Sequence, residues 1–107
     1  MSAAARSVGD LAVLVRSKNA GPFWLTLDIF CGSEEVYDTL AAEGVITPAR
    51  IAGLYQVDPA SVRVFRLANL HVIKISFPRP VPQGAVGDRD MHAGQQHVPL
   101  SRLEIPT

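Results

Sequence analysis

The chain has 107 residues, of which 48% are hydrophobic and 19% charged, and its ten basic residues balance its ten acidic ones. This length fits a single domain, and the charge balance argues against a nucleic-acid binder, which needs a basic face to neutralise phosphates. A single cysteine excludes an internal disulfide and a cysteine-based zinc cluster. Without an apolar run of about 20 residues or a hydrophobic signal core, we expect a cytoplasmic protein that does not bind membranes.

The first half of the chain predicts a hairpin followed by two short helices. Residues 11–16 and 23–30 are rich in apolar and β-branched side chains, and a polar segment with turn-forming residues joins them. Ser33 and Thr47 each stand where a helix N-cap is expected, with apolar residues following at helical spacing. Residues 1–10 show no such pattern, and we expect them to be flexible.

The second half predicts two further strands, at residues 62–67 and 71–77. The order strand–strand–helix–helix–strand–strand predicts an α+β two-layer sandwich. Its mainly antiparallel sheet would carry two helices on one face, in a ferredoxin-like or related ββααββ arrangement. Residues 78–99 contain four prolines and three glycines without periodicity, so we expect a long loop there. Residues 100–105 are apolar enough for a last strand.

One face of this sheet would remain without helices. It carries either Trp24 and Phe30 or the opposite set of side chains, and so large an apolar surface indicates a partner. Asp28 lies in the same strand among apolar neighbours. If its side is buried, it must be paired or functional. The alternative is an ordinary aspartate on a solvated face.

The hairpin connection is the first candidate site, because it groups cations with small polar donors. Arg16 offers two parallel donors to a carboxylate or phosphate, and Lys18 offers a point charge. The alternative is a polar hairpin tip that keeps the loop soluble. Arg79, held between two prolines, is either a further preset cation or part of a plain strand end. The predicted substrate-binding residues here are Arg16, Ser17, Lys18, Asn19, Gly21 and Arg79.

The second candidate is a polar segment within the long loop. It groups two carboxylates, two amides and a histidine, in the order Asp88, Asp90, Gln95, Gln96 and His97. Such groups relay protons or contact a ligand, and without a recognised ligand spacing we predict no metal site. The two aspartates and His97 are the candidate catalytic residues, and the two glutamines are candidate substrate-binding residues. The alternative is a loop that contacts a partner.

Four segments together resemble a small bacterial family of unknown function, DUF4387. They are RSKNAGPFWLTLDIF, VITPARIAGLYQV, IKISFPRP and GDRDMHAGQQHVPL, in this order between residues 11 and 106. Members of this family accompany, or are fused behind, large AtuA-type proteins, which are named for acyclic terpene utilisation and end in a small ferredoxin-like domain. The family pattern falls on the two polar segments, Asp28 and Arg79. It departs at His92, where relatives are expected to carry an aromatic residue.

The resemblance implies a small subunit of a hetero-oligomeric enzyme whose large subunit is an AtuA-type protein. It implies organic-acid or acyl-CoA substrates and lyase or hydratase chemistry, but names no cofactor. In that interpretation the hairpin cations and Arg79 hold a carboxylate or CoA-linked group, while the carboxylates and His97 lie near the reacting carbon or at the interface with the partner. Two alternatives stay open: a non-catalytic module that assembles the partner, and a self-contained homo-oligomeric protein that binds a small anionic metabolite.

Overall fold

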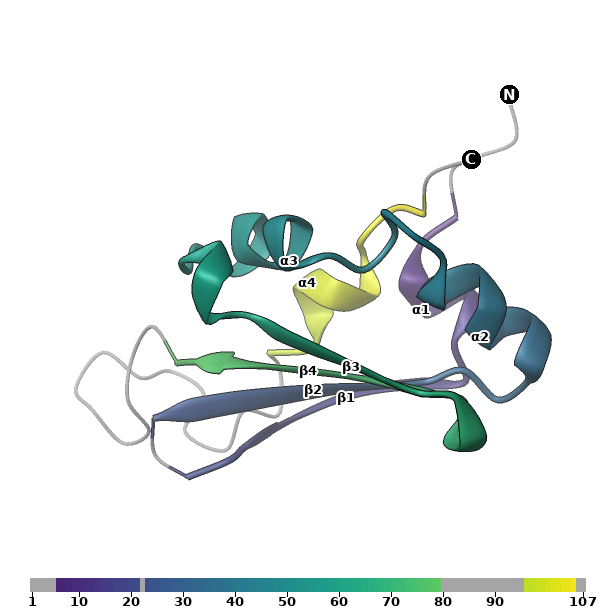
Figure 1. Ribbon diagram of the computed structural model, residues 1–107, viewed down its shortest axis with the longest axis horizontal. Coiled ribbons are helices and arrows are strands. Elements are labelled where there is room, and N and C mark those ends of the chain that lie inside the picture. Colours follow the sequence, from purple (N-terminus) through teal and green to yellow (C-terminus); the bar gives the residue numbers. More distant parts are fainter. Residues whose placement is uncertain (1–5, 22, 80–95, 106–107) are drawn as a thin grey trace.

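The computed structural model of the chain describes residues 6–21, 23–79 and 96–105. The described residues form a four-stranded antiparallel sheet with its α-helices on one side (Figure 1). The strand order is β1-β2-β4-β3, which confirms the predicted α+β two-layer arrangement in its ββααββ form. The strands are β1 (Leu14–Asn19), β2 (Trp24–Phe30), β3 (Arg63–Leu67) and β4 (Val72–Pro78).

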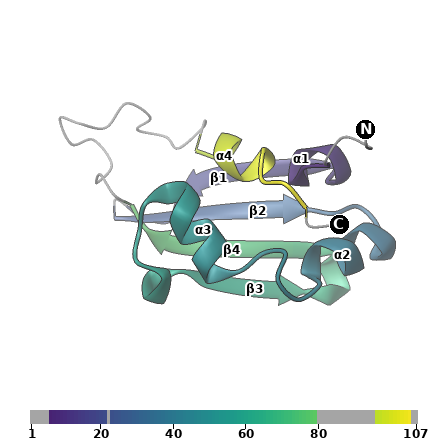
Figure 2. The same ribbon diagram turned by 90° about the horizontal axis from the view of Figure 1, so that it is seen from above.

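The topology explains why the helices cover a single face. Strand β4 pairs antiparallel with both β2 and β3, so the connection from β2 to β3 must cross over the sheet. That connection carries α2 (Glu34–Ala41) and α3 (Pro48–Tyr55), which lie over the same face of the sheet in Figure 2. We call the side covered by helices the inner face and the other side the outer face.

The two central helices begin where the sequence predicts. The Ser33 hydroxyl accepts a hydrogen bond from the Val36 N–H at 3.2 Å, and the Thr47 hydroxyl accepts one from the Arg50 N–H at 3.2 Å. These side chains satisfy N–H groups that have no partner within the helix. Gly32, before Ser33, has a φ of +83°, and a Cβ there would lie 2.2 Å from a Val13 methyl carbon. Glycine is therefore required at this turn.

The two ends of the described chain pair with each other. Ser7 and Asp10 form a capping box for α1 (Val8–Leu11), a helix that the sequence did not predict. Val8 is fully buried, and its N–H donates to the Leu103 carbonyl at 2.9 Å. Residues 100–105 form no strand, because α4 (Val98–Ser101) is followed only by an isolated bridge between Ser7 and Glu104.

Both ends of the segment that was predicted as a loop, residues 78–99, belong to regular elements. Pro78 closes β4, while Val98 and Pro99 begin α4, where a proline in the first turn loses no helical hydrogen bond. Residues 80–95 lie outside the described part of the chain.

The hydrophobic core lies between the inner face and the helices. Within the described residues, no helix is long and apolar enough to cross a membrane. The largest fully buried side chains come from strands and helices alike: Leu25, Leu27, Ile29, Ile73, Ile75, Phe77, Leu40, Ile46, Ile51 and Leu100.

Candidate functional site

The hairpin residues predicted to form one anion site are divided between the two faces of the sheet. Successive side chains of a strand point to opposite faces. In β1, Ser17 and Asn19 pair with Leu27 and Leu25 on the inner face. The intervening Arg16 and Lys18 therefore belong to the outer face, opposite Asp28 and Thr26. Gly21 lies beyond the strand, exposed, with a φ of +80°.

Arg16 is engaged on the outer face. Its Nη2 lies 3.3 Å from the Asp28 carboxylate, and its guanidinium carbon lies 5.1 Å from the centre of the Phe30 ring. Asp28 is only 5% exposed although no helix covers this face. Of the two interpretations of Asp28, the structure therefore shows the buried and paired one. Arg16 stacks on an aromatic ring and holds a buried carboxylate.

Arg79 is instead part of what we call the inner-face cluster: Ser17, Asn19, Arg79, Gln96 and His97. Arg79 is 8% exposed, and its Nη1 donates to the Asn19 side-chain oxygen. Its backbone N–H donates to the Phe23 carbonyl at 2.8 Å, which extends the pairing beyond the end of β4. The His97 N–H donates to the Ser17 hydroxyl at 3.0 Å. Three segments that are distant in sequence thus meet at one end of the inner face.

Tyr55 forms hydrogen bonds that hold this cluster in place. The sequence indicated only that it lies on the apolar side of a helix. Its hydroxyl donates to the Gln96 carbonyl at 2.6 Å and accepts from the Leu100 N–H at 3.2 Å. Its ring centre lies 4.9 Å from that of Phe77. Burial raises the pKa of Tyr55 to about 12, so it stays a neutral donor over the physiological range. The only sequence signal was a phenol on the buried side of a helix, since such a group needs a polar partner.

His97 has one ring atom with unused hydrogen-bonding capacity. Its Nδ1 is buried and has no hydrogen-bond partner among the described residues. Buried polar atoms are normally satisfied, and an imidazole nitrogen without a partner is available to a donor or an anion. The inner-face cluster therefore combines a guanidinium, a hydroxyl, an amide and an imidazole, which are groups that hydrogen-bond to a carboxylate.

Several predicted residues cannot be placed in this geometry. Asp88, Asp90 and Gln95 lie outside the described residues. In the described ranges, no group of three or more histidine, cysteine, aspartate or glutamate side chains is close enough to hold a metal ion.

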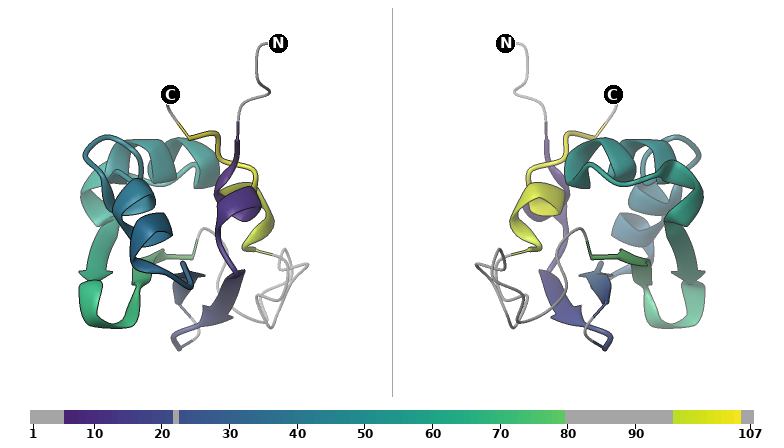
Figure 3. Two further views of the ribbon diagram at one scale, coloured as in Figure 1. Left: turned by 90° about the vertical axis from the view of Figure 1, so that its right-hand side faces the viewer. Right: turned by 90° about the vertical axis from the view of Figure 1, so that its left-hand side faces the viewer.

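The outer face carries exposed apolar side chains. Figure 3 shows from both ends that the helices lie on the opposite side of the sheet. Leu14, Phe65 and Leu67 are 51%, 47% and 38% exposed, and Leu70 in the β3–β4 turn is 69% exposed. Of the two aromatic residues expected on an uncovered face, Trp24 is 38% exposed, and Phe30 is half-buried beneath Arg16.

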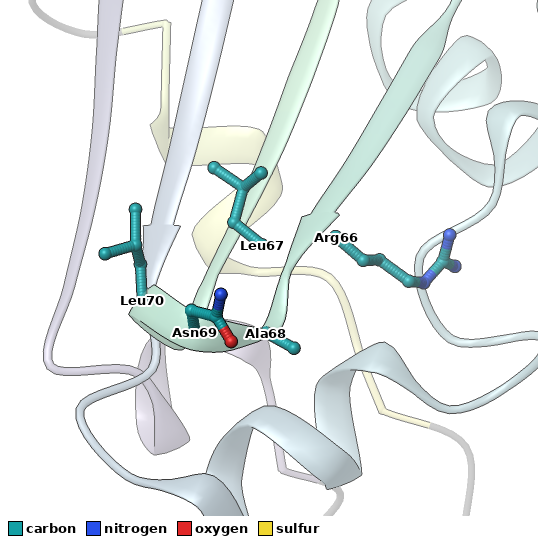
Figure 4. Close-up of a pocket in the computed structure, with 5 residues that line it drawn as sticks. All are labelled: Arg66, Leu67, Ala68, Asn69 and Leu70. Atoms are coloured by element: carbon teal, nitrogen blue, oxygen red, sulfur yellow. The ribbon is translucent and has the colours of Figure 1, made fainter.

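A shallow pocket of about 490 Å³ lies at the β3–β4 turn. Figure 4 shows that Leu67 and Leu70 extend to one side of this turn while Arg66 extends away from them. Arg66 donates to the carbonyls of Ala41 and Ile46, at 3.2 Å and 3.1 Å, and so ties the edge strand to the helical layer. The pocket adds a concave, mainly aliphatic end to the outer face. Its lining residues are Arg66, Leu67, Ala68, Asn69 and Leu70.

A family comparison covers nearly all of this structure. A family model described as a domain of unknown function (DUF4387) matches residues 8–104. The chain belongs to this family. No curated protein and no solved structure gives a significant match to this DUF4387 domain. What the domain does must therefore be argued from its two sheet faces.

Proposed function

We propose that this DUF4387 domain is a protein-docking subunit whose outer sheet face binds a larger partner, and that an AtuA-type protein is that partner. The exposure of Leu14, Phe65 and Leu67 on a face without helices carries the proposal. Contiguous apolar surface of this kind is costly to leave in water and marks interaction sites. The partner's identity rests on the resemblance of the sequence to domains that accompany AtuA-type proteins.

The geometry favours docking over an anion site in the hairpin. An anion site built from Arg16, Lys18 and Arg79 would need three cations on one side of the sheet. Arg79 lies on the inner face and Arg16 on the outer, where it is bonded to Asp28. The cations of the outer face are therefore better suited to a protein surface than to one small metabolite.

The proposal is tested by coexpressing the domain with the AtuA-type protein of its own host and weighing the purified assembly by native mass spectrometry. We expect a stoichiometric complex with the wild-type chain. We expect loss of that complex with Phe65→Ser, and its retention with Ala49→Ser, an exposed position on α3. A wild-type chain that purifies only as a monomer or homo-oligomer would contradict the proposal.

The enzymatic part of the proposal is tested on the same complex. If the domain only assembles its partner, outer-face substitutions reduce the amount of complex and leave the rate per assembled complex unchanged. If the domain contributes to lyase or hydratase chemistry, inner-face substitutions such as His97→Gln reduce that rate while the complex still forms. Turnover divided by the quantity of assembled complex separates the two roles.

The inner-face cluster favours a second function, binding of a carboxylate or acyl-CoA group. The supporting observations are the buried guanidinium of Arg79 and the unpartnered Nδ1 of His97. Isothermal calorimetry with succinate and with coenzyme A tests it directly on the purified domain. We expect binding that His97→Gln weakens and that Arg102→Gln, an exposed change at the end of α4, leaves intact. Absence of heat with both compounds would eliminate this function for the isolated chain.

A further inference from the structure

Among the described residues, the acidic side chains are nearly absent from the outer face of the sheet. The outer face carries four cationic side chains, Arg16, Lys18, Arg63 and Lys74, as the strand registers place them. Asp28 is the one acidic residue in the described strands, and it is already bonded to Arg16. The other acidic residues of the described chain lie in helices and connections: Asp10, Glu34, Glu35, Asp38, Glu43, Asp58 and Glu104. A chain with no net charge thus presents a basic sheet face.

Strand pairing arranges this face in rows that run across the four strands. Each row contains one residue from each strand, in the order β1, β2, β4 and β3, and neighbouring residues in a row are register partners. The row nearest the β3–β4 turn is apolar: Leu14, Phe30, Val72 and Leu67. The next row is Arg16, Asp28, Lys74 and Phe65, and the third is Lys18, Thr26, Ser76 and Arg63.

The pocket extends the apolar end of this pattern. It includes Leu67 of the first row and adds Leu70, which is 69% exposed. The outer face therefore has an apolar end with a concave edge, followed by two rows that contain the cations. A complementary surface would present apolar side chains at one end and acidic side chains one to two rows beyond them, in the direction of the strands.

We propose that the outer face receives a protein partner that presents an apolar ridge beside a row of carboxylates. This proposal rests on the docking role proposed above and defines the surface that the partner must carry. Acidic side chains would meet Lys18, Lys74 and Arg63, while the ridge would cover the first row and enter the pocket. Such an arrangement steers association and fixes the orientation of the two proteins.

Charge argues against a second copy of this chain as the occupant. Two sheets packed face to face lie about 10 Å apart. Two outer faces at that separation would oppose the four cations of each copy, with only the Asp28 carboxylate of each copy, already bonded to Arg16, between them. Desolvating cations without a paired anion is strongly unfavourable.

The side chains of the face also favour protein over nucleic acid. Single-stranded nucleic acids are held by neighbouring aromatic rings on which bases stack. Here the Phe30 ring is occupied by the Arg16 guanidinium, 5.1 Å from its centre. Phe65 lies on the edge strand, two rows and two strands away from Trp24, and the large hydrophobic groups exposed at the adjoining β3–β4 turn are the aliphatic Leu67 and Leu70.

Site-specific photocrosslinking in the native host tests this inference without assuming the partner's identity. Phe65→p-benzoylphenylalanine places the reactive group beside Lys74 at the β3 end of the second row, and Ala49→p-benzoylphenylalanine is the matched control on α3. Crosslinked peptides are identified by mass spectrometry. We expect Phe65 to crosslink to a different protein, at a segment that contains both apolar and acidic residues.

Charge reversal supplies the second measurement. Lys74→Glu is expected to reduce the crosslinked product roughly tenfold or more, because a carboxylate would then face carboxylates. Arg102→Glu, at the end of α4, is expected to leave the yield unchanged. Replacing the partner's crosslinked acidic residues with lysine is expected to restore the yield with Lys74→Glu.

Each outcome distinguishes between the possible binding partners of the outer face. Crosslinks to another copy of the chain, to nucleic acid, or to a partner segment without acidic residues overturn the inference, as does an unchanged yield with Lys74→Glu. A yield at Phe65 no higher than at Ala49 overturns both the inference and the docking function. An acidic partner that is not an AtuA-type protein supports the inference and refutes only the partner identity proposed above.

Discussion

The two faces of the sheet are built from alternating residues of the same strands, yet their side chains differ in burial. In β4, the inward residues Ile73, Ile75 and Phe77 are fully buried beneath the helices. The outward residues Val72, Lys74 and Ser76 are only half-buried, with no helix above them. The inner face therefore holds most of the burial that stabilises the fold. The outer face carries charged and exposed apolar groups that contribute little burial to the fold, as the proposed docking role requires.

Substitutions of Phe77 and Phe65 test this comparison through the free energy of unfolding. The substitution of Phe77 is expected to have the largest effect. Its ring is fully buried against Tyr55 on the inner face. We expect Phe77→Ala to lower the free energy of unfolding by about 3–5 kcal/mol, through lost burial and a residual cavity. Urea unfolding followed by circular dichroism measures it. A loss below about 1 kcal/mol would contradict the assignment of Phe77 to the core.

Tyr55→Phe is expected to have the next largest effect. It removes the hydroxyl that links α3 to the C-terminal segment and leaves the Leu100 N–H and the Gln96 carbonyl without this partner. A buried group that loses its hydrogen bond costs about 1–3 kcal/mol. The same unfolding experiment tests it. Equal stability of the variant and the wild type would show that water replaces the hydroxyl.

Tyr55 also predicts an alkaline limit to stability. Because the folded-state pKa is raised from 10.0 to about 12, the folded chain holds this proton more tightly than the unfolded chain. This contribution is complete below pH 10 and is lost as the pH rises from 10 to 12. We therefore expect a flatter pH dependence for Tyr55→Phe over that interval. Burial also raises the pKa of Cys31, but this thiol is common to both proteins and cancels in the comparison.

Arg16→Ala is expected to have a smaller effect on stability. The Arg16 side chain is half exposed, and Lys74 remains opposite Asp28 when Arg16 is removed. Half-exposed ion pairs contribute about 0–1 kcal/mol, so we expect a loss within that range. The matched change Arg102→Ala, without a bonded carboxylate among the described residues, sets the baseline. A loss above about 2 kcal/mol would show that Arg16 alone compensates the buried Asp28.

Phe65→Ala is expected to have the smallest effect on the isolated domain and a large one on its assembly. Its ring is 47% exposed, so the free energy of unfolding should change by less than about 0.5 kcal/mol. Complex formation with the partner should nevertheless fall, because aromatic side chains dominate interface energies. Sedimentation of the complex measures this. A variant that loses stability but retains assembly would reverse the roles assigned to the two faces.

Elements were predicted well where the signal for them lies within a few neighbouring residues. Ser33 and Thr47 mark the helix starts because a cap requires only a side chain and an N–H three residues later. The first strand was predicted at residues 11–16 but is Leu14–Asn19. Pairing with β2 extends that strand through Ser17, Lys18 and Asn19, whose local preference is for a turn.

The sequence identified which polar residues are candidates for a site, but it did not show which of them contact one another. The tail segment could not be related to the hairpin because nothing local connects His97 with Ser17, 80 residues earlier, or Arg79 with Asn19, 60 residues earlier. The role of Tyr55 was missed for the same reason, since Gln96 is 41 residues away. Such contacts form only when the fold brings these distant segments to the same end of the sheet.

The sequence alone determined the α+β class and the helix starts, because these follow from local backbone geometry. Tertiary structure decided that the first strand continues to Asn19, which separates Arg16 and Lys18 from Ser17 and Asn19. Tertiary structure decided which side of each strand the helices cover. It also decided that Val8 pairs with Leu103 and that Arg79 is buried while Phe65 is exposed. These outcomes depend on how the chain crosses over its own sheet, and burial is then set by contacts between residues far apart in the sequence.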